Sequence, residues 1–146
     1  MGKTVRVRGG VPHLNAALRG WPKNANKELR DEATKISQKV ATAAQGIGAG
    51  EVGVIRKVAP SIRPKRDRYP SLAMGFRTPK WRKGKGQYAQ AVVYGAEFGS
   101  LTYSHLEPWR GVEGGGYALW PAIRAMEDET KQAYADAMVD ALLRGI

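Results

Sequence analysis

Residues that could support enzyme chemistry are few in this chain and poorly arranged for catalysis. Among 146 residues there is no cysteine, and the two histidines are His13 and His105. This composition excludes thiol catalysis, a disulfide scaffold and cysteine- or histidine-rich metal sites. Ser104 directly precedes His105, but neighbouring side chains of an extended chain point apart and no sharp turn marks a serine nucleophile. The sequence therefore does not predict a serine hydrolase.

Two further kinds of catalytic or cofactor site find equally little support. A carboxylate pair for glycoside hydrolysis would have to come from Glu97, Glu107 and Glu113, which all lie in loop-rich sequence. The stretch 83–87 (KGKGQ) lacks the hydroxyl residue that follows lysine in a phosphate-binding loop. We therefore expect a protein that is not an enzyme and that carries no cofactor or metal.

Charge is distributed very unevenly along the chain. The whole sequence has 24 basic and 13 acidic residues, a net charge of +11. Residues 1–85 carry a net charge of +15, whereas residues 86–146 carry −4. Such a chain can bind nucleic acid, an acidic protein surface or the acidic part of a second copy of itself. The third option leads to rings when the rotation between copies closes.

The positive charge is densest between residues 56 and 85. This segment holds a single acid, Asp67, and its aromatic residues include Tyr69 and Trp81, which would suit stacking on nucleic-acid bases. The alternatives are docking on an acidic partner and a solvated basic loop. The cations of the segment are Arg56, Lys57, Arg63, Lys65, Arg66, Arg68, Arg77, Lys80, Arg82, Lys83 and Lys85.

Hydrophobic periodicity predicts one α+β domain over residues 1–146. Apolar residues at three- and four-residue steps predict a long helix over 23–45, ended by the glycines at 46, 48 and 50, and a second helix over 121–143. Alternation predicts strands over 4–8, 51–59, 72–77 and 87–94, and Pro12 favours a short helix over 13–19. We expect an antiparallel sheet of about three to four strands, with the C-terminal helix packed on it. A long basic hairpin loop (about 56–86) and a glycine-rich loop (about 100–116) complete this prediction.

Two short motifs flank the glycine-rich loop. The first is Tyr94-Gly95-Ala96-Glu97-Phe98-Gly99-Ser100, and the second runs from Leu119 to Arg124 (LWPAIR). Core packing by the aromatic residues explains much of both motifs. Glu97 is a candidate for an ion pair near the end of the sheet. Trp109 lies in the loop itself, where an exposed tryptophan typically marks a contact surface.

The order of these features resembles the head–tail joining, or tail-completion, proteins of long-tailed bacteriophages. The first family motif is matched by Tyr94, Glu97, Phe98 and Gly99, with Ser100 in place of the usual threonine. The second, a helix start, is matched by Leu119, Trp120, Pro121, Ala122, Ile123 and Arg124. The general layout extends over most of the chain, whereas the specific matches occupy residues 94–100 and 117–124.

The resemblance implies a structural protein of the virion, made in the host cytoplasm. Members of this family form homo-oligomeric rings, including six-fold rings, between the connector of the head and the tail tube. Neighbouring connector and tail-terminator proteins would be the partners, and the basic loop would face either an acidic ring or DNA in the channel. No apolar run approaches 18 residues and the first residues form no signal peptide, so we expect a soluble protein without a membrane partner. The residues expected at ring and partner interfaces are Arg63, Lys65, Arg66, Arg68, Trp81, Lys83, Glu97 and Trp109.

Overall fold

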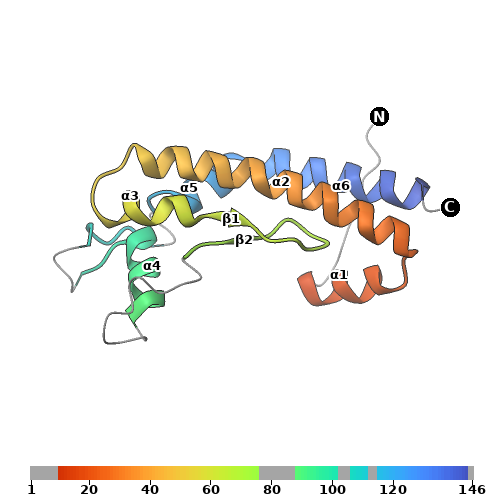
Figure 1. Cartoon of the computed structure of the whole chain (residues 1–146), viewed down its shortest axis with the longest axis horizontal. Helices are drawn as coiled ribbons and strands as arrows, with labels where there is room; N and C mark the ends of the chain where they lie inside the picture. Colours follow the sequence, from red (N-terminus) through yellow and green to blue (C-terminus); the bar gives the residue numbers. More distant parts are fainter. Residues whose placement is uncertain (1–9, 76–87, 102–105, 112–114, 145–146) are drawn as a thin grey trace. The chain divides into compact units, whose positions relative to one another are not determined.

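The computed structural model describes residues 10–75, 88–101, 106–111 and 115–144 (Figure 1). Helices account for 67% of these residues, and the sheet consists of two short antiparallel strands. The described chain is therefore mostly helical. Its elements are α1 (Gly10–Arg19), α2 (Lys23–Ala49), α3 (Val54–Val58), the 3-10 turn η1 (Ala59–Ser61), β1 (Arg63–Pro64), β2 (Leu72–Ala73), α4 (Tyr88–Phe98), α5 (Leu119–Ala125) and α6 (Glu127–Arg144).

These elements form two compact units. Unit 1 comprises residues 1–38, 64–71 and 127–146, and unit 2 comprises residues 39–63 and 72–126. Each unit has a hydrophobic cluster of its own. None of the described helices combines the length and apolar character that crossing a membrane requires.

The core of unit 1 is a contact among three helices. Leu14 and Leu18 of α1 pack with Leu29 of α2 and Met138 of α6, and Ala25, Ala137 and Ala141 fill the space between them. Burying a leucine or methionine side chain of this kind stabilises the fold by roughly 1.5–3 kcal/mol. The prediction that the C-terminal helix packs on the sheet is therefore wrong, because the buried residues of α6 cluster with those of α1 and α2.

The segment between the two strands is tied to the helices of unit 1. The backbone N–H of Ser71 donates to Ser37 Oγ at 2.9 Å, and the Tyr134 hydroxyl donates to the carbonyl of Arg68. Tyr69 packs against the cluster of unit 1. The non-helical segment 64–71 thus packs on the helices of unit 1.

The core of unit 2 is built around the second half of α2. Val40, Ala41 and Ala44 of α2 are buried, together with eight further residues of the unit. A Cβ at position 48 would overlap the Cβ of Ala59, so Gly48 allows α2 to approach η1 closely. The buried residues from the rest of unit 2 are Ile55, Val58, Ala59, Ile62, Ala96, Tyr117, Ala118 and Ala122.

Of the three glycines predicted to end this helix, only Gly50 lies at its end, directly after Ala49. α2 continues through Gly46 and Gly48 to Ala49. Glycine weakens a helix interior by only about 1 kcal/mol relative to alanine, which packing of the helix on its neighbours offsets.

Two predicted strands are helices. The segment 51–59 contains α3, whose buried residues Ile55 and Val58 are three residues apart, as one face of a helix requires. The segment 87–94 contributes most of α4, Tyr88–Phe98. Short apolar runs rich in valine fit either element, and here tertiary packing overrides their β-propensity.

The remaining predictions are partly borne out. The helix predicted over 121–143 is present as α5 and α6, which are separated at Met126. Of the strand predicted over 72–77, Leu72 and Ala73 form β2, and the described part of 100–116 is irregular. The predicted strand 4–8 and the tip of the basic hairpin at 78–86 lie outside the described residues.

We predict that Tyr134→Phe alters the pH dependence of stability. Burial raises the pKa of Tyr134 above its usual value, because the folded state disfavours the phenolate. The stabilisation by the neutral hydroxyl is therefore fully present below about pH 10 and is lost as the pH rises further.

Urea unfolding at several pH values measures this effect. At neutral pH the variant should be less stable by about 1 kcal/mol, since it lacks the bond to Arg68. Above pH 10 the difference between the two proteins should shrink. Tyr94→Phe, at a side chain that is 53% exposed, is the matched control and should stay within about 0.5 kcal/mol at neutral pH. A constant difference at every pH would contradict the prediction.

Candidate functional site: the Glu97 cap and the exposed loop

The side chain of Glu97 connects the end of α4 to the start of α5. One carboxylate oxygen, Oε2, accepts the backbone N–H groups of Ala118 at 3.1 Å and Leu119 at 2.9 Å. The other, Oε1, accepts the N–H of Trp120 at 2.6 Å. Glu97 is only 1% exposed, so this carboxylate is a buried part of unit 2.

These three bonds satisfy the requirements of both partners. The first N–H groups of a helix have no partner within the helix, and Ala118, which precedes α5, has no side chain that could cap it. A buried carboxylate is costly unless hydrogen bonds surround it, and the positive end of a helix suits negative charge. Glu97 therefore acts as a long-range cap for α5.

Glycine makes room for this cap. Gly116 has φ of +64°, a left-handed conformation that side chains rarely adopt, and a Cβ there would overlap Oε1 of Glu97. Gly99, with φ of +85°, allows the chain to turn directly after α4, where a Cβ would overlap the carbonyl of Pro108. Gly99 and Gly116 are thus both required by their backbone conformation and by atoms that approach them closely.

The cap brings together the two motifs that the sequence analysis singled out. Tyr94 and Phe98 of the first motif stack with ring centroids 4.8 Å apart. In the second, Ala122 is fully buried and the Arg124 guanidinium lies 5.5 Å from the ring centroid of Trp120. Glu97 joins the two groups through α5, whose helical residues Leu119, Trp120, Pro121, Ala122, Ile123 and Arg124 form the second motif.

The partners of Glu97 in the structure are therefore backbone N–H groups instead of the basic side chain that an ion pair requires. Hydrogen bonds from backbone N–H groups stabilise the carboxylate, and none of the described cations lies within ion-pair distance of it. Its position is also on a helix instead of near the end of a sheet. The signal for this role is present in the sequence, because α5 begins without serine, threonine, asparagine or aspartate and so needs a cap from elsewhere.

The loop that follows α4 is held firmly at its base. Ser100 N–H donates to the carbonyl of Glu107 at 2.9 Å, and Arg110 N–H donates to the carbonyl of Phe98 at 2.7 Å. The buried Tyr117 donates its hydroxyl to the carbonyl of Pro108 at 2.7 Å. These bonds, which the sequence analysis did not anticipate, fix both ends of the loop on unit 2.

From this fixed base two apolar side chains project into solvent. Leu101 is 89% exposed and Trp109 is 46% exposed. Next to Trp109, the Arg110 guanidinium lies 3.8 Å from the centroid of the Tyr117 ring and is exposed. Trp109 is exposed, and the contact surface expected there stays a prediction. We call Leu101, Trp109 and Arg110 the loop patch.

Two of the basic residues expected at an interface have side-chain partners within the chain. Arg63 donates to the carbonyls of Ser61 and Gly75 at 3.1 and 2.6 Å. Arg66 forms an ion pair with Asp31 at 2.7 Å, which at this exposure contributes at most about 1 kcal/mol.

The other four expected interface residues differ in what the structure says of them. Arg68 is half-buried, and its carbonyl accepts the Tyr134 hydroxyl. Lys65 is exposed and has no ionic partner among the described residues. Trp81 and Lys83 lie outside the described residues. Of the four described basic side chains, Lys65 is exposed without an ionic partner among the described residues, whereas Nε of Arg68 is buried without a hydrogen-bond partner.

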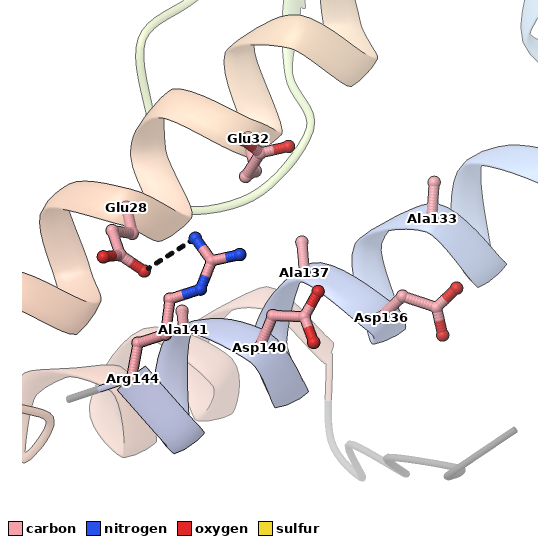
Figure 2. Close-up of a pocket in the computed structure, with 8 residues that line it drawn as sticks. All are labelled: Glu28, Glu32, Ala133, Asp136, Ala137, Asp140, Ala141 and Arg144. Carbon is pink, nitrogen blue, oxygen red and sulfur yellow. Dashed lines mark ion pairs between the residues drawn. The ribbon is translucent and has the colours of Figure 1, made fainter. Parts of the chain in front are cut away.

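Unit 1 contains a groove between α2 and α6 (Figure 2). Its volume is about 240 Å³, and Arg144 lies 3.7 Å from Glu28 across it. The described part of the chain contains no cluster of three or more residues able to hold a metal ion. Charged and small side chains line the groove. The lining residues are Glu28, Glu32, Ala133, Asp136, Ala137, Asp140, Ala141 and Arg144.

Comparison of the chain with known protein families, with curated proteins and with solved structures gives no match. Support for a function therefore comes from the residues themselves and from the resemblance of two motifs to those of head–tail joining proteins.

We predict that Glu97→Gln destabilises the protein by about 1–3 kcal/mol, because the amide keeps only one acceptor for the three N–H groups. Glu97→Ala should be worse, since it removes both acceptors and leaves a buried cavity. Denaturant unfolding measures both changes. Glu129→Gln, the same substitution at an exposed position of α6, is the control and should remain within about 0.5 kcal/mol. An equal effect at both positions would rule out the cap.

A pair of glycine substitutions tests the space around the cap. Gly116→Ala should lower the melting temperature, because the new Cβ would meet Glu97 and the backbone has a positive φ. Gly46→Ala should raise it, since no atom lies within 4 Å of that Cβ and alanine stabilises a helix interior by about 1 kcal/mol. Calorimetry should show a lower melting temperature for Gly116→Ala and a higher one for Gly46→Ala. The same direction for both would contradict it.

Proposed function

We propose that this protein is a structural subunit of the head–tail junction of a long-tailed bacteriophage. In this proposal the chain closes into a homo-oligomeric ring, six-fold in symmetry, between the connector and the tail tube. The observation that carries the proposal is the Glu97 cap, because residues of both motifs of the resemblance meet there. The three hydrogen bonds of Glu97 give the polar residue of the first motif a definite physical role, which supports the resemblance.

A structural role agrees with the use of the carboxylate. Both oxygens of Glu97 accept backbone N–H groups, so this residue is unsuited to transfer protons to a substrate. The exposed Trp109 and the uneven charge of the chain also favour a function in assembly, since tryptophan and arginine are enriched at protein interfaces. We accordingly propose a protein of the virion that is not an enzyme.

Among the basic residues, Lys65 is the best candidate for contact with a neighbouring ring. It is exposed, whereas the side chains of Arg63 and Arg66 have partners within the chain and Arg68 is half-buried. Reversing all four charges would therefore mix a loss of binding with a loss of stability. Lys65→Glu alone separates the two effects, and Lys39→Glu, at an exposed position of α2, is the matched control.

Cryo-electron microscopy of the virion that contains this protein tests the proposal. We expect symmetric copies of the chain between connector and tail tube. In particles assembled with the Lys65→Glu variant, we expect fewer joined heads and tails than with Lys39→Glu. A complete neck without this chain would overturn the proposal.

The alternative function is a nucleic-acid-binding module that uses residues 56–85. It is favoured by Arg56, Lys57 and Lys65, which are exposed and have no ionic partner among the described residues. Binding of this kind weakens steeply with salt, because each neutralised phosphate releases counterions. Fluorescence anisotropy with duplex DNA at several salt concentrations distinguishes the two functions, since docking on protein predicts weak DNA binding with a shallow slope.

A further inference from the structure

We propose that the loop patch of one copy docks on α6 of a second copy, so that unlike surfaces meet head to tail. This inference depends on the proposed function only in requiring that the chain assembles with itself. It names the two surfaces that would meet, which the motif resemblance does not.

The loop patch has the properties of a preformed contact. Leu101 and Trp109 are exposed, yet the loop that carries them is fixed at both ends by backbone hydrogen bonds and by the hydroxyl of Tyr117. A fixed tryptophan loses little conformational freedom on binding, which is why such side chains dominate many interfaces. The patch also carries a positive charge, because no described carboxylate lies within ion-pair distance of Arg110.

The proposed counterpart is a face of α6 with the complementary character. Asp136, Asp140 and Leu143 are four and three residues apart, so they line one side of this helix. Leu143 is 55% exposed, and Asp136 and Asp140 border the groove drawn in Figure 2. Asp140 has no ionic partner among the described residues.

The two surfaces match in both apolar and charged character. Leu101 and Trp109 of one copy would cover Leu143 of the next, and Arg110 would approach Asp140. Charge complementarity favours a second copy over a neutral or basic partner, because opposite potentials steer association and like charges oppose it. Since the loop patch belongs to unit 2 and α6 to unit 1, each copy keeps one free surface of each kind after a contact has formed. Such heterologous contacts continue into a ring or a filament.

Two variants with complementary defects test this geometry. Trp109→Ser damages the loop patch and leaves α6 intact, whereas Leu143→Glu damages the α6 face and leaves the loop patch intact. Each variant alone should self-associate about tenfold more weakly than the unaltered chain, as the loss of one central apolar contact predicts. A mixture of the two should form a 1:1 heterodimer, because one intact loop patch and one intact α6 face remain between them.

Native mass spectrometry of the full-length chains, with one variant isotopically labelled, measures these species. Arg110→Asp should also weaken association, and adding Asp140→Arg to it should restore association. Arg56→Asp is the control, since it makes the same charge change on the exposed surface of α3. Circular dichroism verifies that every variant is folded.

Three outcomes would overturn the inference. They are an unaltered chain that stays monomeric up to its solubility limit, oligomers that neither variant weakens, and a mixture that forms no heterodimer. Oligomers that persist in both variants would leave the head–tail function standing, since the ring would then use other surfaces. Absence of the chain from the neck, by contrast, would remove the proposed function without affecting a heterodimer observed in solution.

Discussion

Burial of the Glu97 carboxylate is the constraint on which unit 2 depends. Burying a negative charge without partners would lower the stability of the fold by several kcal/mol. Here three backbone N–H groups at the start of α5 donate hydrogen bonds to the charge. The interaction fixes α4 and α5 relative to each other within the unit. It also accounts for Gly116, where any side chain would occupy the space of the carboxylate.

The loop between α4 and α5 is held in place next to the Glu97 cap. Its base begins at Gly99, directly after the residue pair Glu97 and Phe98, and it is closed by the bond from Tyr117, which directly precedes the capped residues. A loop fixed in this way can expose Trp109 without losing its conformation. The buried carboxylate thus supports the backbone that carries the exposed Trp109.

Sequence patterns predicted the long helices well and the short elements poorly. The helix over 23–45 has enough periodic residues to identify its face, as does the C-terminal helix. The segments 51–59 and 87–94 are too short and too rich in valine for periodicity to distinguish helix from strand. Packing decides instead, since Ile55 and Val58 belong to the core and Val93 packs against it. Periodicity also could not reveal that the motif residue Glu97 would meet N–H groups 21 to 23 positions later in the chain.

The basic residues illustrate a second limit of sequence reasoning. Arg63, Arg66 and Arg68 count equally in a tally of charge, yet Arg63 donates to backbone carbonyls, Arg66 pairs with Asp31, and Nε of Arg68 is buried without a hydrogen-bond partner. Charge density predicts that a segment attracts an acidic partner, whereas the internal contacts decide which side chain can reach it. Among the described cations expected at an interface, Lys65 is exposed and has no ionic partner among the described residues.

Amide hydrogen exchange, measured residue by residue with nuclear magnetic resonance, tests the Glu97 cap most directly. The account predicts that the N–H groups of Ala118, Leu119 and Trp120 exchange slowly, although they belong to the first turn of a helix, where such groups ordinarily lack partners. It also predicts that Glu97→Gln accelerates their exchange far more than that of amides in α6. Fast exchange of these three amides in the unaltered protein would contradict the account.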